Sequence, residues 1–236
     1  MKTKFYSIAI ILVSQPTLFG FGCIGNEVRQ NYKTVACEFS GVELKTSANV
    51  FITQSDEASF RIEAEESSKE SIMVETFNDR LIISSKDDSN WNKEVNIFVT
   101  IKELNTIKLS GSGTITFLNK VKCDNLDLRL SGSGNINGNI DSKFLTISLS
   151  GSGNIELKGS ANESELNISG SGNVNGRDLK STSSTIKITG SGTSIVDVAD
   201  KLDVEINGSG NVYYISNPER MHAKSRGSGK VEKIKA

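Results

Sequence analysis

Histidine and tryptophan occur once each in this chain of 236 residues, and proline occurs only twice. With one histidine, His222, the chain cannot build a metal site from several histidines, and a Ser-His-Asp triad would have to use that residue. We interpret His222 as a surface residue. Because proline is scarce and charged residues make up 23% of the chain, the composition is not that of a disordered protein.

An excess of charge of either sign is also missing. The 27 Lys and Arg residues nearly balance the 28 Asp and Glu residues, which leaves a formal net charge of -1. Binding to nucleic acid or to an anionic membrane surface usually requires a basic face. The charge balance therefore predicts neither as a partner.

The apolar run at the N-terminus is too short to cross a bilayer, which takes about 20 residues. It extends from Phe5 to Val13, follows Lys2 and Lys4, and precedes Pro16 and small residues up to Cys23. This order is typical of a secretory signal peptide. We predict a signal peptide over residues 1–22 and export to a bacterial cell envelope, either as an outer-membrane lipoprotein or as a periplasmic or cell-surface protein.

Cys23 is the expected lipidation site. The segment Leu18-Phe19-Gly20-Phe21-Gly22-Cys23 resembles a lipoprotein processing site, in which the cysteine becomes the lipid-carrying first residue. Gly22 fits the pattern, whereas Gly20 stands where leucine is usual. Ordinary signal cleavage nearby is the alternative. A lipid on Cys23 would be the chain's contact with a membrane.

Two further cysteines, Cys37 and Cys123, could pair in an oxidising envelope. The alternative is that Cys123 is a small residue at a tight bend. Counting back from each Gly-Ser-Gly triplet places small residues at the equivalent positions, namely Ser142, Ala161, Ser181 and Ala199.

The triplet Gly-Ser-Gly occurs seven times, with successive copies 18 to 21 residues apart. A repeat near 19 residues that tolerates small length changes is typical of coiled β-architectures. The triplets lead into strands and contain no Asp, which disfavours phosphate loops and calcium-binding β-rolls, and no cofactor is expected. We interpret the glycines as structural corners. They are Gly111, Gly113, Gly132, Gly134, Gly151, Gly153, Gly170, Gly172, Gly190, Gly192, Gly208, Gly210, Gly227 and Gly229.

Apolar and polar residues alternate on both sides of each triplet, as in Leu145, Ile147 and Leu149. A period of two indicates strands with one buried and one wet face. After Gly192 the expected apolar position holds Ser194, followed by Ile195 and Val196, which suggests a one-residue register change there. The pattern predicts an all-β fold, a parallel β-solenoid of about 19-residue coils, in which serines and asparagines form stacked polar ladders. The asparagines are Asn135, Asn154, Asn173 and Asn211.

The N-terminal third lacks the triplet but remains rich in β-branched residues. Residues 42–50 repeat the spacing of strand, corner and asparagine, with Thr46 and Ala48 in place of glycines, which predicts a degenerate first coil. Hairpins are expected around residues 78–79 and 87–90. The predicted organisation is a linker over 23–37 and a single solenoid domain over 38–236, irregular over 38–105 and regular over 106–236.

The order of these parts resembles the putative auto-transporter adhesin, head GIN domain family of envelope proteins. The residues that carry the resemblance are Phe39-Ser40-Gly41-Val42, Val50 to Asp56, Leu81-Ile82-Ile83, Val99 to Leu104, and Leu109-Ser110-Gly111-Ser112-Gly113 with its later copies. The resemblance covers about residues 38 to 232. It implies a β-helical envelope protein, often lipid-anchored. Members have also been compared in fold with pectin-degrading β-helices, so the resemblance leaves an enzyme as an alternative.

Catalysis on such a scaffold would need clustered carboxylates on an outer strand face. The nearest pairs are Asp124 with Asp127, Asp197 with Asp200, and Asp203 with Glu205, of which the last would share one outward face. A solvated surface is the alternative for each. The run Glu63, Glu65, Glu66 and Glu70 is interpreted as solvated, with weak calcium binding as its alternative.

Trp91, Tyr213 and Tyr214 are the candidate contacts for a glycan or protein ligand, because aromatic faces provide contact area at low entropic cost. For Trp91, packing over one end of the solenoid is the alternative. We therefore hypothesise a non-enzymatic envelope adhesin or partner-binding protein. The alternatives are a polysaccharide-acting enzyme or carbohydrate-binding module, and a periplasmic structural or signalling-associated lipoprotein. Three or more carboxylates converging in one groove would favour the enzyme, whereas flat polar ladders would favour binding.

Overall fold

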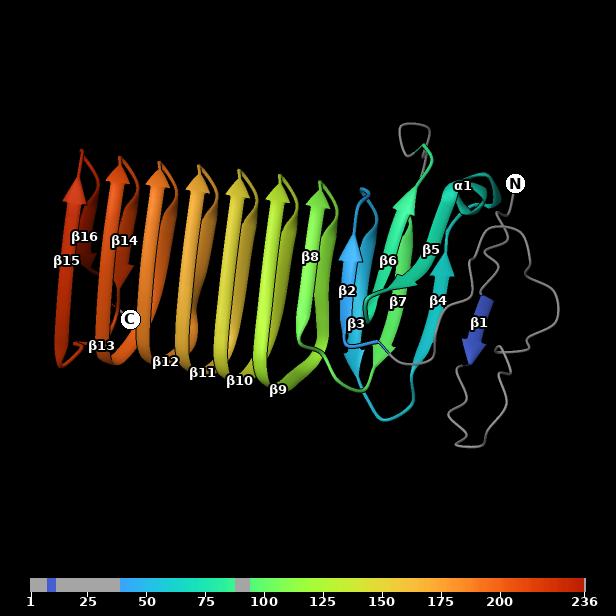
Figure 1. Cartoon of the computed structure of the whole chain (residues 1–236), viewed down its shortest axis with the longest axis horizontal. Coiled ribbons are helices and arrows are strands. Elements are labelled where there is room, and N and C mark those ends of the chain that lie inside the picture. The colour runs from blue at the N-terminus through green and yellow to red at the C-terminus, as the bar shows by residue number, and fades with distance from the viewer. Residues whose placement is uncertain (1–7, 12–38, 88–93, 236) are drawn as a thin grey trace.

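The alternation around each Gly-Ser-Gly triplet produces long strands that each make one whole coil. The computed structural model describes residues 8–11, 39–87 and 94–235. Each long strand begins after one triplet and ends at the first glycine of the next. The five strands of this kind are β9 (Thr114–Gly132), β10 (Asn135–Gly151), β11 (Asn154–Gly170), β12 (Asn173–Gly190) and β13 (Thr193–Gly208). Figure 1 shows them side by side along the long axis.

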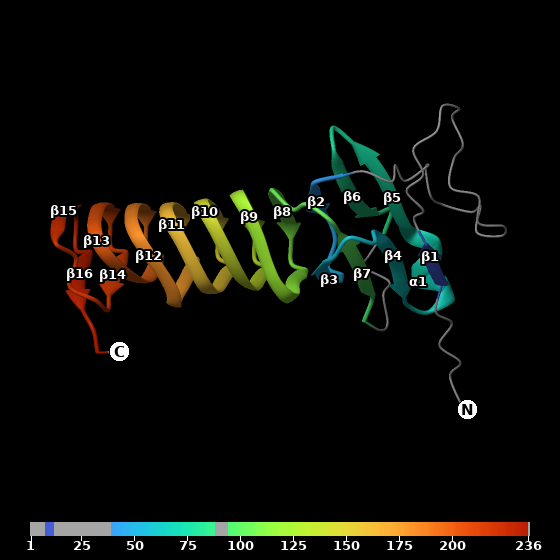
Figure 2. The same cartoon turned by 90° about the horizontal axis from the view of Figure 1, so that it is seen from below.

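Neighbouring coils pair in parallel and in register. Ile147 of β10 lies opposite Leu128 of β9 and Leu166 of β11, and Gly151 lies opposite Gly132 and Gly170. The inward residues of both sides form one continuous apolar core along the axis. Figure 2 shows the two layers of strands that enclose it. The predicted parallel β-solenoid is therefore confirmed, and the helical content of the described residues is limited to α1 (Glu66–Ser71).

The degenerate first coil is also confirmed. It consists of β2 (Gly41–Leu44) and β3 (Asn49–Gln54). Strand β2 pairs in parallel with β8 (Thr106–Gly111), and β3 pairs in parallel with the first part of β9. At the corner between β2 and β3, the Thr46 hydroxyl accepts a hydrogen bond from the backbone N–H of Ala48 at 3.0 Å. A side chain thus supports the turn that glycines make in the later coils.

Antiparallel pairs close the N-terminal end. On one side β5 (Ile72–Phe77) pairs with β6 (Arg80–Ser85), which lies beside β2. On the other side β4 (Ser59–Glu63) pairs with β7 (Asn96–Ile101), which lies beside β3. The β5–β6 turn contains Asn78 and Asp79 at φ 48° and 57°, as expected for a two-residue hairpin turn. The expected hairpin around residues 87–90 lies largely outside the described residues.

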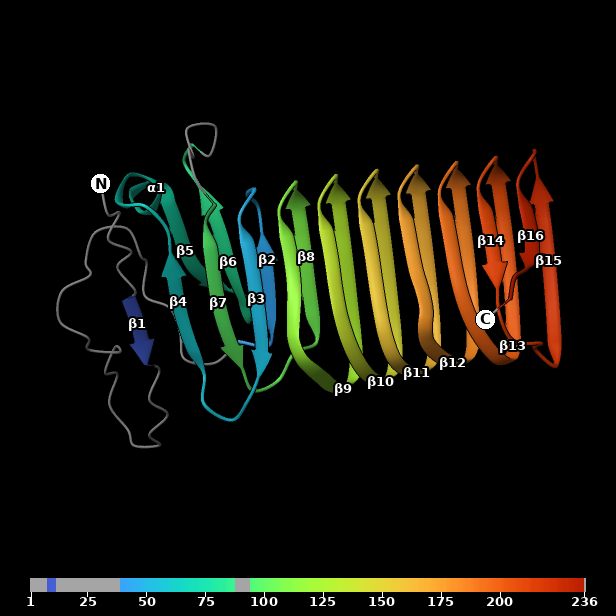
Figure 3. The same ribbon diagram turned by 180° about the vertical axis from the view of Figure 1, so that it is seen from behind.

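Strand β1 (Ile8–Ile11) pairs antiparallel with β4. These residues fall within the predicted signal peptide, whose removal stays a prediction. The last coil consists of β14 (Asn211–Tyr214), β15 (Arg220–Arg226) and β16 (Lys230–Lys233). Strand β15 adds to β13, and β16 adds to β14 (Figure 3).

Two details of the repeat differ from the sequence-based expectation. Ser194 is fully buried and stays in register with Val174 and Val212, so the expected register change at Ser194 is wrong. The register shifts fall later, between Gly176 and Lys180 and between Ser181 and Ser183, in the bend where β13 is shorter than β12. For the same reason Val198, rather than the expected Ala199, lies opposite Ser181.

The corners bring neighbouring backbones into contact. Gly151 has a φ of +116°, and a Cβ on it would lie 2.5 Å from the carbonyl oxygen of Gly132 in the preceding coil. A Cβ on Gly153 would lie 2.5 Å from the carbonyl oxygen of Gly134. Both distances are far below ordinary contact, and positive φ strains any residue that has a Cβ.

We predict that Gly151→Val destabilises the protein by roughly 3 kcal/mol, since left-handed backbone strain and overpacking add together. Lys158→Val is the control, because Lys158 is exposed on the next strand and loses only a solvated side chain. Urea unfolding followed by circular dichroism measures both variants. Equal midpoints for the two would contradict the corner interpretation.

Candidate functional site

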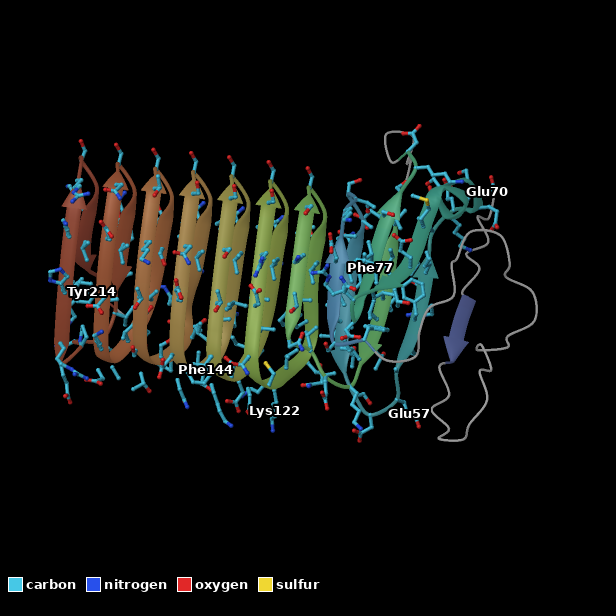
Figure 4. The ribbon with its side chains drawn as sticks, in the orientation of Figure 1. Glu57, Glu70, Phe77, Lys122, Phe144 and Tyr214 are labelled. Carbon is cyan, nitrogen blue, oxygen red and sulfur yellow. The ribbon has the colours of Figure 1, made fainter. Side chains whose placement is uncertain are left out.

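The outer faces of the solenoid carry polar side chains in rows that run from coil to coil. In one row the Asn154 amide donates to Asn135 Oδ1 at 3.2 Å, and the Asn173 amide donates to Asn154 Oδ1 at 3.0 Å. Figure 4 shows these regular rows of side chains along the coils. Each row consists of equivalent residues on neighbouring paired strands. Its successive side chains are therefore about 4.8 Å apart, on a rigid surface.

One outer face contains a shallow trough near the C-terminal end. It has a volume of about 270 Å³ and lies across three adjacent strands, β12, β13 and β15. Its lining combines hydroxyl, carboxylate, imidazole and ammonium groups with the strand segments at Ile186 and Val204. The polar lining residues are Thr185, Lys187, Asp203, Glu205, His222 and Lys224.

Two rows of three residues form the trough. Thr185, Asp203 and His222 occupy equivalent positions on successive coils. Lys187, Glu205 and Lys224 occupy the next outward positions. The carboxylate of Asp203 is held by Lys201 Nζ at 2.6 Å. The trough thus offers donors and acceptors side by side, which suits a ligand rich in hydroxyl groups.

The three predicted carboxylate pairs lie in different surroundings. Asp203 and Glu205 share the outward face of β13, as expected from their spacing, and both line the trough. In the first predicted pair, Asp124 forms an ion pair with Lys143 at 2.9 Å and Asp127 forms one with Arg129 at 2.7 Å. Within the described part of the chain, no three His, Cys, Asp or Glu residues are grouped to hold a metal ion. Flat polar rows, rather than a convergence of carboxylates, dominate the described outer faces.

Asp197 has a role that the sequence did not indicate. Its carboxylate is buried and accepts hydrogen bonds from Lys180 Nζ and, at 2.5 Å, from Ser216 Oγ. Burial raises the pKa of Asp197, but the hydrogen bonds from Lys180 and Ser216 and the charge of Lys180 outweigh burial, so the pKa lies below its ordinary value. The interaction ties three successive coils together. Its partner in the predicted pair, Asp200, instead binds Arg220 at 2.7 Å.

The aromatic candidates lie in different settings. Tyr213 is half-buried on an outer face, between Ile195 and Glu232 of the neighbouring strands. Tyr214 packs partly against the core (Figure 4). Trp91 lies outside the described residues, as does Cys23.

The structure also contains a stack of aromatic rings that was not predicted from the sequence. Phe51 of β3 and Phe98 of β7 have ring centroids 5.0 Å apart, and the Arg61 guanidinium lies 4.0 Å from the Phe98 centroid. These residues are far apart in the sequence and meet only through parallel strand pairing. Since the rings cover each other's faces, the stack stabilises this end of the solenoid.

Cys123 is a free, half-buried thiol, and Cys37 lies outside the described residues. Burial and the nearby Asp124 and Asp141 raise the pKa of Cys123 to about 11. The thiol is therefore protonated at neutral pH, which makes it a weak nucleophile.

Comparisons with known proteins agree with this architecture. Residues 38–218 match a family model described as "Putative auto-transporter adhesin, head GIN domain". A putative adhesin from Bacteroides fragilis is 25% identical, with a TM-score of 0.80 over 85% of this chain and 94% of its own. No curated protein matches the chain. Among the described residues, no helix has the length and apolar character needed to cross a membrane.

Two more distant crystal structures share the fold. A putative adhesin from Parabacteroides merdae is 21% identical, with a TM-score of 0.71 over 98% of this chain and 97% of its own. A putative lipid binding protein from Parabacteroides distasonis is 24% identical, with a TM-score of 0.68 over 86% of this chain and 95% of its own.

We predict that Asp197→Asn lowers the free energy of unfolding by about 1 to 3 kcal/mol at neutral pH, because the ion pair between the buried Asp197 carboxylate and the exposed Lys180 is replaced by a weaker hydrogen bond. A carboxyl whose folded-state pKa is depressed stabilises the fold above its unfolded pKa. The difference between wild type and variant should therefore shrink as the pH falls below 3.8, the ordinary value for this group.

Chemical denaturation at a series of pH values measures this effect. Asp141→Asn is the matched control, since Asp141 is exposed and also accepts a hydrogen bond from a serine of the next coil, Ser160. A pH-independent difference for Asp197→Asn would be inconsistent with the ion pair as its cause.

Proposed function

This chain belongs to the putative auto-transporter adhesin, head GIN domain family, and from that membership we propose that it is a non-enzymatic envelope protein that binds a glycan or protein partner. The partner lies against the outside of the solenoid, and the principal contact is the trough formed by β12, β13 and β15. The proposal extends to the location of the protein, which we place at the cell envelope, anchored through a lipid on Cys23.

The trough is the observation that carries this proposal. Among the lining residues, Asp203 and Glu205 can accept hydrogen bonds from a ligand, Lys187 and Lys224 can donate them, and the Thr185 hydroxyl can do both. Sugar hydroxyls also donate and accept, so a carbohydrate can form hydrogen bonds with both the donors and the acceptors of the trough. A glycan is therefore the preferred ligand, and Tyr213 on the opposite outer face is a second candidate contact.

The scaffold explains how a shallow site can recognise a ligand. The lining residues stand on paired strands rather than on loops, so little backbone conformational entropy is lost when the ligand binds. A site this open gives low affinity for one ligand unit. Several copies displayed on one cell would raise the overall strength of attachment through multivalency.

A glycan and matrix-protein array probed with the purified protein tests the proposal. Wild type should bind one class of glycan, and the double variant Asp203→Ala, Glu205→Ala should lose at least about tenfold in affinity, because two charged hydrogen-bond acceptors are removed. Isothermal calorimetry with the selected glycan provides the affinities.

The control carries the same chemical change outside the trough. Glu156 and Glu163 are exposed carboxylates on β11, so Glu156→Ala, Glu163→Ala should bind as wild type does. If the wild-type protein bound no glycan and no matrix protein on the array, the adhesin proposal would be wrong. Cleavage of the bound glycan, detected by mass spectrometry and lost with Glu205→Gln, would instead favour the enzyme.

A further inference from the structure

The two ends of the solenoid are built differently. At the N-terminal end, the antiparallel strands β4 and β5 close the stack, and their inward residues Phe60, Ile62, Ile72 and Val74 are buried. At the C-terminal end the parallel stacking simply continues into β15 and β16. Among the described residues, β15 pairs only with β13 and β16 only with β14.

The inward positions of β15 are exposed. Met221, Ala223 and Ser225 extend the rows of Leu202, Val204 and Ile206, all three of which are buried. Met221 is 41% exposed, although it occupies a core position. Backbone N–H and C=O groups along an unpaired strand edge are a template for another strand.

The outward positions of β15 are basic. They hold Arg220, His222, Lys224 and Arg226, which stand over Lys201, Asp203, Glu205 and Asn207 of β13. Of these, Arg220 is already paired with Asp200 across the two coils.

In the row through Lys187, Glu205 and Lys224 the sign of charge alternates from coil to coil. Because the earlier coils hold uncharged Asn167 and Ser148 in this row, the alternation is confined to the last three coils, and a carboxylate over Lys224 would continue it. Basic side chains on β15 also disfavour two copies joined through their own β15 strands, because like charges would face each other.

We propose that the β15 edge binds an extended strand of a partner protein, with carboxylates at the outward positions and small apolar residues at the inward ones. The strand adds to the sheet beside β15 and covers Met221, Ala223 and Ser225. Backbone hydrogen bonds provide the affinity, and the cations of β15 select the acidic partner. This site shares His222 and Lys224 with the trough but does not rest on the ligand proposed for the trough.

Two labelled peptides provide the test, one of alternating glutamate and valine and one of alternating lysine and valine. Fluorescence anisotropy with the purified protein should show the acidic peptide binding at least about tenfold more tightly, since several opposite-charge pairs form across the strands. Amide shifts in nuclear magnetic resonance spectra should map to β15. Equal affinity for the two peptides, or shifts confined to other strands, would overturn the proposal.

Two variants of β15 separate the contributions of the edge and of its charge. Ala223→Lys places a charge at an inward position, which is how edge strands are commonly blocked, and should abolish binding of the acidic peptide. Arg226→Glu should weaken it several-fold and improve binding of the basic peptide. Asn139→Lys, at an exposed position on the bend of β10, is the control for the added lysine and should bind as wild type does.

Folding of each variant is verified by its thermal unfolding curve, and Ala223 is exposed, so its replacement removes no buried group. The trough variant Asp203→Ala, Glu205→Ala should lose the glycan and still bind the acidic peptide, which distinguishes the two sites. A wild-type dimer in light scattering that becomes a monomer with Ala223→Lys would contradict the acidic partner and identify a second copy as the occupant.

Discussion

Close contact between glycine corners of successive coils is the constraint on which this structure depends. The carbonyl oxygen of Gly132 occupies the space that a Cβ on Gly151 would need, and the same contact recurs along the stack. With the corners fixed in this way, the strands on both sides are held in register, and the inward Leu and Ile residues form continuous rows. The outward residues then form rows as well, so the polar surface is a consequence of the same backbone contact.

Repetition made most of the fold predictable from sequence. Each coil must satisfy the same neighbours, so equivalent residues recur and their spacing marks the corners. Even the first coil, with Thr46 and Ala48 in place of glycines, kept the spacing that reveals it. The bend opposite the corners was less predictable. There the coils differ in length, and the shortening of β13 was absorbed after Gly176, where no recurrent residue indicates the register.

In the candidate site, too, features within one strand were predictable from the sequence, whereas contacts between coils were not. A period of two correctly predicted that Asp203 and Glu205 share one outward face. That His222 and Lys187 lie beside them depends on the register between coils, and hence on the lengths of the bends between them. The stack of Phe51 on Phe98 depends on parallel pairing across a long excursion of the chain, which alternation within either strand does not reveal.

At the C-terminal end of the solenoid, where less apolar surface is buried, polar contacts between coils hold the last coil in place. The inward positions of β15 hold Met221, Ala223 and Ser225, which bury less apolar surface than the Leu, Val and Ile of β13. In compensation, Ser216 donates to the buried Asp197, and Arg220 pairs with Asp200, so two side-chain contacts join the last coil to β13. His222 and Lys224 of this coil form one wall of the trough. The shape of the proposed binding site therefore depends on the polar contacts that join the last coil to β13.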